Sequence, residues 1–111
     1  MTPEPSDSLP LSGFTVLELG EDISAPYCGK LLADYGADVI KVEPPRGDPA
    51  RRHGPFPDDL PHPEKSALFL YLNTNKKGVT LDFSTASGAR LLRRLVEEVD
   101  VLVENQPAAR L

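Results

Sequence analysis

Three arginines follow a break in the sequence pattern. The run YGADVIKVEPPRGDPARR begins as an alternating strand over residues 37–43 and then reaches two prolines and a glycine. Because proline fixes the backbone and lacks an N–H donor, the strand must end there. Arg46, Arg51 and Arg52 therefore lie on a stiff loop, the arginine loop. It is a candidate anion site or, alternatively, a solvated charged face.

No other group of residues is spaced for a recognised chemistry. His53 and His62 lie among prolines without ligand-spaced partners, so we expect no metal. The sequence lacks a G-x-S-x-G elbow, and Cys28, expected to be a small buried side chain, has no histidine to pair with. Glu43 lies about twenty residues beyond the Gly20 loop, as a ribose-binding acid does, but the glycine fingerprint is missing. A nicotinamide-binding fragment is therefore an alternative, and no catalytic residue is assigned.

The composition is that of one ordinary globular domain. The chain has 111 residues, of which 40% are hydrophobic and 26% charged, and its net charge is -5. An acidic chain is a poor general binder of nucleic acid, whose phosphates need a basic face. A single cysteine fits a reducing, cytoplasmic setting, and no apolar run of about eighteen residues predicts a membrane span. The polar, proline-rich residues 1–12 are expected to form a flexible tail.

The elements that position these residues follow a strand, helix, strand plan. FTVLELG is rich in residues that favour strands and ends at Gly20. SAPYCGKLLADYG is typical of a helix that Ser24 caps and Gly36 terminates. Its apolar stripe is Leu31, Leu32 and Tyr35. The strand over residues 37–43 completes a β-α-β unit, whose right-handed crossover makes its two strands parallel.

A second unit follows the proline-rich residues 53–65. SALFLYLN fits either a helix or a strand, and its apolar spacing favours the helix. KKGVTLDFS is typical of a strand, TASGARLLRRLVEEV of an amphipathic helix capped by Ser84 or Thr85, and VDVLVEN of a buried strand. The two units predict an α/β, Rossmann-like layered domain with a mainly parallel sheet.

Ligands of such a sheet bind beyond the carboxyl ends of its strands. Those ends are predicted at residues 20–24, 43–46, 82–84 and 104–106. The arginine loop therefore lies on the ligand-binding edge, near the N-terminus of the first helix, whose unpaired N–H groups attract anions. A phosphorylated cofactor is the natural candidate.

A series of segments resembles a known family. The ordered set LSGFTVLELG, APYCGKLLADYGADVIKVEPPRGDPAR, GPF, NTNKKGVTLD and DVLVEN is similar to the N-terminal region of the class III CoA-transferases. That family includes formyl-CoA transferase and the α-methylacyl-CoA racemases. The resemblance covers residues 11–105. It implies that residues 13–111 are the N-terminal part of a Rossmann-like large domain that binds coenzyme A.

The resemblance also implies an activity and an assembly. Class III transferases move CoA between an acyl-CoA and a free carboxylic acid, through covalent intermediates on a catalytic aspartate, and they form interlocked homodimers. That aspartate lies well downstream of the VEN motif. We therefore expect this chain to lack the catalytic segment and the small domain, and to be inactive alone. The alternatives are a racemase-type acyl-CoA enzyme with acid/base residues, and a non-catalytic CoA-binding or assembly module.

Matching positions transfer the family's CoA contacts to this sequence. The basic residue that meets the CoA phosphates corresponds to Pro44, so Arg46 is its nearest substitute. After VEN the family has Phe and then Pro-Gly, whereas this chain has Gln106, Pro107 and Ala108, which removes an aromatic ring from the pantetheine site. The implied CoA contacts are Ile23, Ser24, Arg46, Leu81, Asp82, Phe83, Ser84, Asn105, Gln106 and Pro107.

Overall fold

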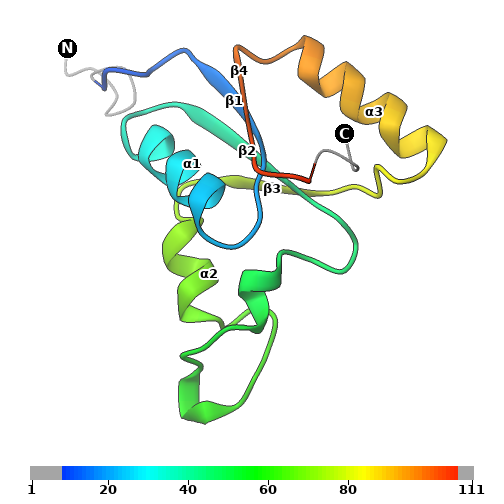
Figure 1. Ribbon diagram of the computed structural model, residues 1–111. Helices are drawn as coiled ribbons and strands as arrows, with labels where there is room; N and C mark the ends of the chain where they lie inside the picture. Colours follow the sequence, from blue (N-terminus) through cyan, green and yellow to red (C-terminus); the bar gives the residue numbers. More distant parts are fainter. Residues whose placement is uncertain (1–8, 108–111) are drawn as a thin grey trace.

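The protein is a four-stranded parallel sheet with helices on both faces, seen in a computed structural model that describes residues 9–107 (Figure 1). Its strands are β1 (Thr15–Leu19), β2 (Asp38–Glu43), β3 (Lys77–Thr80) and β4 (Val101–Glu104). They lie in the order β3-β2-β1-β4, and each neighbouring pair is parallel. The predicted α/β fold with a parallel sheet is confirmed.

Two long helices make the crossovers of the two units. Helix α1 (Ser24–Asp34) links β1 to β2, and α3 (Ala86–Glu97) links β3 to β4. The longer connection from β2 to β3 contains two 3-10 turns, η2 (Pro49–Arg52) and η3 (Pro57–Asp59), and the short helix α2 (Ala67–Leu72). The segment that fitted either a helix or a strand is therefore a helix. Ser66 caps it by accepting a hydrogen bond from the N–H of Phe69 at 3.2 Å.

The central strands divide their side chains between two apolar clusters. Alternate residues of a strand point to opposite faces of the sheet, so each face has its own cluster. The cluster under α1 consists of Val16, Ala33, Ala37 and Val39. The cluster on the α3 side is built on Leu17, Leu19 and Val42, with Leu92 and Leu95 of α3 packed against it. The core therefore lies on both sides of β1 and β2.

Helix α1 packs through its small residues. Its buried residues are Ala25, Pro26, Gly29 and Ala33. The predicted stripe is only partly right, because Leu32 packs on the core whereas Leu31 and Tyr35 are exposed. The prediction that Cys28 is buried is wrong, since Cys28 lies off this narrow stripe and is exposed.

The two long helices begin in different ways. Thr85 caps α3 as predicted, because its Oγ1 accepts a hydrogen bond from the N–H of Gly88 at 3.0 Å. The prediction that Ser24 caps α1 is wrong, since Ile23 occupies the N-cap position and makes no side-chain hydrogen bond there. The Ser24 hydroxyl instead accepts a hydrogen bond from Nδ2 of Asn105 at 3.1 Å. A contact 81 residues away in the sequence thus replaces the local one.

The residues expected to form an N-terminal tail lie mostly outside the described range. Near the end of that segment, the N–H of Leu11 donates to the carbonyl of Tyr35 at 2.9 Å, and the Leu11 side chain packs against the cluster under α1. Across residues 9–107, no helix is long and apolar enough to cross a membrane.

Candidate functional site

A crevice opens where the chain reverses its direction across the sheet. The first crossover leads from β1 to β2, whereas the last one places β4 on the opposite side of β1. In parallel α/β sheets, ligands bind at this reversal, beyond the carboxyl ends of the two strands. The crevice has a volume of about 550 Å³. Its lining residues are Glu21, Asp22, Ile23, Ser24, Asn105 and Pro107.

Asn105 joins the two sides of the crevice. Its Oδ1 accepts a hydrogen bond from the N–H of Glu21 at 2.9 Å, and its Nδ2 donates to the Glu21 carbonyl at 2.9 Å. A side-chain amide that bonds both backbone groups of one residue fixes the orientation of that residue. Gln106 makes a second connection, because its Nε2 donates to the carbonyl of Leu19 at 2.9 Å. These two predicted site residues therefore tie the end of β4 to the end of β1 and to the loop that follows it.

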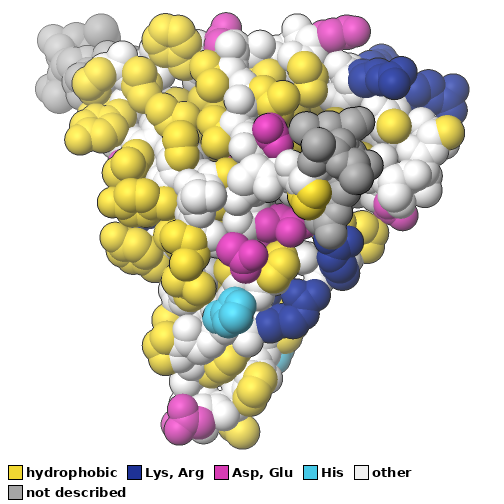
Figure 2. Space-filling view, in the orientation of Figure 1, with side chains coloured by type: hydrophobic (Ala, Val, Ile, Leu, Met, Phe, Trp, Pro, Cys, Tyr) yellow, Lys and Arg dark blue, Asp and Glu magenta, His cyan; other side chains and the backbone are white. Residues whose placement is uncertain are grey.

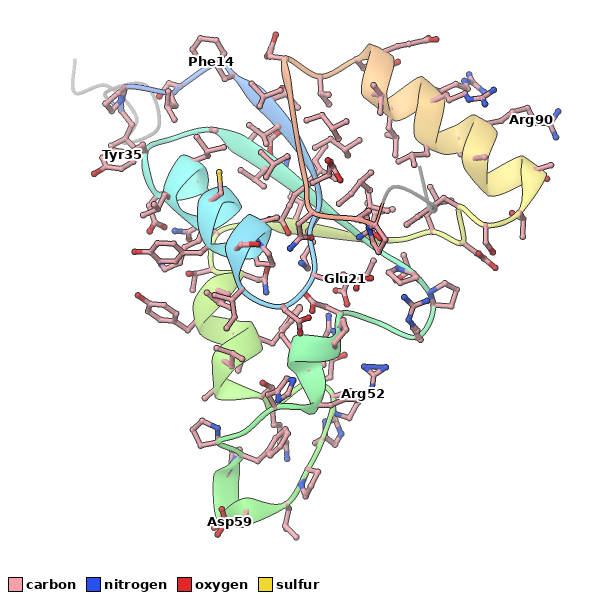
Figure 3. All side chains as sticks on the ribbon, in the orientation of Figure 1. Phe14, Glu21, Tyr35, Arg52, Asp59 and Arg90 are labelled. Atoms are coloured by element: carbon pink, nitrogen blue, oxygen red, sulfur yellow. The ribbon has the colours of Figure 1, made fainter. Side chains whose placement is uncertain are left out.

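The crevice is acidic inside and basic beside it. Glu21 and Asp22 both line it, so a phosphate placed between their carboxylates would be repelled. Nη2 of Arg46 lies 3.3 Å from Oε1 of Glu21, with half of the arginine side chain exposed. Arg52 follows, with its Nη2 donating to the Arg46 carbonyl at 3.3 Å, and Figure 3 shows it below the loop that carries Glu21. This arrangement favours a neutral group in the crevice and an anionic group next to the arginines.

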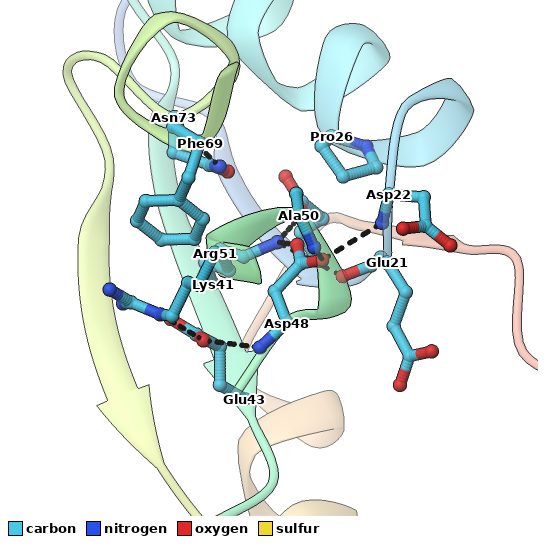
Figure 4. Close-up of polar contacts among 12 residues, drawn as sticks. Glu21, Asp22, Pro26, Lys41, Glu43, Asp48, Ala50, Arg51, Phe69 and Asn73 are labelled. Carbon is cyan, nitrogen blue, oxygen red and sulfur yellow. Dashed lines mark hydrogen bonds and ion pairs between the residues drawn. The ribbon is translucent and has the colours of Figure 1, made fainter. Parts of the chain in front are cut away.

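Arg51 and Glu43 are paired with each other. Nε and Nη2 of Arg51 donate to the two carboxylate oxygens of Glu43 at 2.8 and 2.7 Å, and the guanidinium lies 3.7 Å from the centre of the Phe69 ring (Figure 4). Burial acts to raise the pKa of Glu43, but hydrogen bonds from Arg51 and from the N–H of Asp48 outweigh it and hold that pKa below its ordinary value. Glu43 is thus engaged within the fold, so the nicotinamide alternative loses its ribose-binding acid. The arginine loop offers Arg46 and Arg52 to an anion.

Four buried charged side chains lie beneath the loop after β1, and the sequence analysis missed them. We call them the buried charge cluster: Glu18, Lys41, Asp48 and Lys76. Lys41 Nζ lies 2.9 Å from Glu18 Oε2 and 2.9 Å from Asp48 Oδ2, and Lys76 Nζ lies 2.5 Å from Glu18 Oε1. Each side chain is at most 3% exposed. The available signal was a charged residue at a core position in each of two apolar strands, at Glu18 and Lys41, which the register places side by side.

The predicted contacts at residues 81–84 lie apart from the crevice. Leu81 and Phe83 pack against the cluster on the α3 side. Asp82 Oδ1 accepts hydrogen bonds from the hydroxyl and the N–H of Ser84, at 2.5 and 3.1 Å, and these bonds lower the pKa of Asp82. Phe83 also lines a second, mainly apolar groove of about 510 Å³ between α3 and β4. The remaining lining residues of that groove are Leu19, Ala89, Leu92, Arg93, Val96, Glu97 and Leu102.

The two histidines belong to the proline-rich connection. His53 supplies its carbonyl to the hydroxyl of Ser66 at 2.6 Å, and Nδ1 of His62 accepts a hydrogen bond from the N–H of Glu64 at 3.0 Å. Within the part of the chain that the structure describes, no group of three or more histidine, cysteine or acidic residues is placed to hold a metal ion.

Comparison with known proteins finds relatives that are described as CoA-transferases. A family model described as CoA-transferase family III matches residues 11–111. Succinyl-CoA--D-citramalate CoA-transferase of Chloroflexus aurantiacus is 45% identical over 97 residues, and succinate--glutarate CoA-transferase of Agrobacterium fabrum is 43% identical over 108 residues. These alignments cover 86% and 95% of this chain, but 23% and 27% of the two relatives. The chain therefore spans about a quarter of the length of the curated relatives it matches.

A solved structure supports the same relationship. The crystal structure of a CAIB/BAIF family protein from Brucella suis matches with a TM-score of 0.77 and 42% sequence identity. The match covers 88% of this chain and 26% of that one. Sequence and backbone thus agree over nearly the same part of the chain.

Proposed function

The chain belongs to CoA-transferase family III, and we propose that its crevice holds part of a coenzyme A molecule in a protein that transfers CoA between an acyl-CoA and a carboxylic acid. The observation that carries the proposal is the crevice itself. Four residues expected to contact CoA line it, and it lies where a parallel sheet binds ligands. Those four are Ile23, Ser24, Asn105 and Pro107.

The names of the relatives divide the substrate into a common part and a variable part. Those names specify D-citramalate, glutarate, (R)-2-hydroxy-4-methylpentanoate and phenyllactate, and all four proteins are CoA-transferases. Each is between 37% and 45% identical to this chain. A segment shared by transferases for such different acids is suited to the part that their substrates share. We therefore assign the crevice to the CoA moiety and not to the acid.

Charge and strand order suggest how CoA lies along the sheet edge. The uncharged pantetheine arm fits the acidic crevice between β1 and β4, and the phosphates fit beside Arg46 after β2. The adenine then lies toward residues 81–84, after β3. With strands about 4.8 Å apart, the carboxyl ends from β4 to β3 span about 15 Å, over which the ten implied contact residues are distributed.

The proposal also includes an assembly and a location. The resemblance implies a homodimer, and the single cysteine implies a cytoplasmic setting. Large apolar side chains gather over α1 and α2, on the left of Figure 2. They include Tyr27, Leu31, Tyr35, Leu70 and Tyr71. An exposed patch of this kind marks an association surface, here for a second copy of the chain. Sedimentation velocity tests this, because Leu31→Glu should shift a dimer toward monomer, and a wild-type chain that stays monomeric contradicts it.

Calorimetric titration with CoA, pantetheine and NADH tests the ligand assignment. We expect CoA and pantetheine to bind and NADH not to bind. Arg46→Met should weaken CoA about tenfold, because a charge-assisted hydrogen bond contributes roughly 1.5 kcal/mol, and should leave pantetheine unchanged. Arg93→Met, a matched exposed arginine on α3, should change neither affinity.

Three results would contradict the assignment. The folded chain could fail to bind CoA, NADH could bind as well as CoA, or Arg46→Met could weaken CoA and pantetheine equally. The last result would mean that Arg46 shapes the crevice and does not meet the phosphates.

A further inference from the structure

We infer that the buried charge cluster of Glu18, Lys41, Asp48 and Lys76 positions the loop after β1 together with the first residues of α1, residues 20–26, so that the backbone of this segment is set in advance to receive the ligand. The identity of that ligand as coenzyme A rests on the proposed function. The effect on the loop rests on the geometry alone. In this account the four residues act through the loop, and none of them lines the crevice within the described residues.

Three of the four side chains bond directly to the backbone of residues 20–26. The contacts fall at its start, its middle and its end, and Figure 4 shows the middle one. The pairs are Lys41 Nζ with the Gly20 carbonyl at 2.9 Å, Asp48 Oδ1 with the Asp22 N–H at 2.9 Å, and Lys76 Nζ with the Pro26 carbonyl at 2.8 Å. Because the same side chains are ion-paired with one another, the three contacts are linked through the cluster.

Asp22 lies at the bend of the loop and is held there by a contact from outside the loop. Its φ of 62° lies in the left-handed region, which residues other than glycine adopt uncommonly. Its N–H is held by Asp48, while its exposed side chain lines the crevice. Helix α1 starts without a side-chain cap, so the helix start does not fix the loop. The loop is instead held by the cluster on one side and by Asn105 on the other.

The cluster also packs closely against the start of α1. A Cβ atom added to Gly29 would lie 2.1 Å from Oε1 of Glu18, and one added to Gly20 would lie 2.9 Å from its Oε2. Gly29 is needed here for the close approach of the backbone to the carboxylate, and Gly20 for its close approach to both the carboxylate and the Ala25 side chain, whose Cβ would lie 2.7 Å from the added atom. The packing of Gly20 and Gly29 against Glu18 therefore sets the distance between the start of this segment and the sheet.

Stability alone does not explain four buried charges. Taking ions out of water opposes their mutual attraction, and apolar side chains of similar volume are often neutral or stabilising replacements. Burial lowers the pKa of Lys76, and the neighbouring Glu18 carboxylate acts in the opposite direction. An apolar core could fill the same space, but it could not supply three directed hydrogen bonds to a loop. The charged side chains therefore add directed hydrogen bonds that hold the backbone of residues 20–26 in one position.

The test uses the 111-residue chain and the charge-balanced double variant E18Q/K76M. This variant removes one acid and one base, leaves Lys41 paired with Asp48, and removes the hydrogen bond from Lys76 to the Pro26 carbonyl. We expect at least a tenfold rise in the Kd for CoA, and at least tenfold faster amide hydrogen exchange at residues 22–25, with exchange in β2 unchanged. K77M is the matched control, because Lys77 is exposed, pairs with Asp38 and should affect neither readout.

The readouts separate positioning from stability. A lower melting temperature with unchanged CoA affinity and unchanged loop exchange in the folded variant would overturn the inference. Should the double variant not fold, D48N keeps the side-chain shape but removes the charge facing Lys41, and at least threefold faster exchange at Asp22 is then required. If the wild-type chain binds no CoA, the proposed function fails, while the exchange rates still decide whether the cluster positions the loop.

Discussion

The two sides of the sheet are filled in different ways. Beneath α1 the strands present apolar residues and then buried charges, and the helix approaches them through small residues. On the other side, α3 packs leucines onto an apolar cluster, yet within residues 86–97 only Gly88 is fully buried. The flanking strand β4 is also open, with Val101 and Leu102 exposed by 41% and 44%. The prediction that this strand is buried is therefore wrong, because β4 lies at the edge of the sheet within the described residues. The α1 side is thus the tightly packed one, and the crevice lies where the two sides meet.

This difference shows what a sequence pattern reports. Helix α3 has the sharper amphipathic pattern and the lower burial, whereas α1 has a broken stripe and a closely packed inner face. Amphipathic spacing indicates that a segment is helical, because it follows the helix's own period. How deeply the helix is buried depends on its neighbours, and for α1 the decisive neighbour is Glu18.

Crowding Glu18 should have the largest effect. In Gly29→Ala the new Cβ meets the Glu18 carboxylate. Overpacking typically costs about 1–3 kcal/mol, and because the Glu18 carboxylate is fully buried we expect a loss near the upper end of that range. Urea unfolding measures the loss. The control is Gly78→Ala in β3, where a Cβ meets nothing within 4 Å and the change should stay within about 0.5 kcal/mol. Equal losses of stability in Gly29→Ala and Gly78→Ala would contradict this account. They would mean that α1 moves away from the sheet at little cost when a methyl group is added.

Breaking a charge pair should come next. Arg51→Met leaves Glu43 without its guanidinium, and the loss should be about 2 kcal/mol at pH 7. The folded pKa of Glu43 is lowered, so the stabilisation is present above its unfolded pKa of about 4.3 and disappears as the pH falls through the folded value. The gap between wild type and variant should therefore close in acid.

Unfolding at pH 7 and at a series of acid pH values measures that gap. Arg93→Met on α3 is the matched control, and it should stay within about 0.5 kcal/mol of wild type throughout. A gap for Arg51→Met that does not change with pH would show that the arginine acts by packing on Phe69 and not by its charge.

The helix starts should give the smallest contrast. Thr85→Ala removes the cap of α3 and should cost about 1 kcal/mol. Ser24→Ala removes a hydroxyl that caps nothing, so thermal unfolding should show a loss below about 0.5 kcal/mol. A larger loss for Ser24→Ala than for Thr85→Ala would reverse the comparison and make α1 the helix that depends on its first residue.

The sequence predicted what local patterns control. The strands, the helices and the parallel pairing follow from spacing over ten to fifteen residues, so they were predictable. The loops after β1 and β4 were expected at the same edge, and the structure brings Ser24 and Asn105 into contact. The Ser24 cap was wrong for the same reason, because a long-range partner outcompeted the local one.

The buried charge cluster could not be predicted from local patterns. Its members come from two strands, a loop and a turn, and they meet because register and crossover bring them together. Only Glu18 and Lys41 gave a signal in the sequence, since each is a charged residue at a core position of an apolar strand. Asp48 and Lys76 lie in segments where charged residues are normally solvated, so nothing in their sequence context marked them as buried.

Amide mapping with CoA tests the central claim most directly. The claim is that the ligand lies at the meeting point of the two sides of the sheet, beyond β1 and β4. Adding CoA to the ¹⁵N-labelled chain should shift the amide signals of residues 22–24 and the side-chain amide of Asn105, and leave those of Leu92, Val96 and Leu102 in place. Shifts confined to the groove between α3 and β4, or none at all in a folded chain, would contradict it.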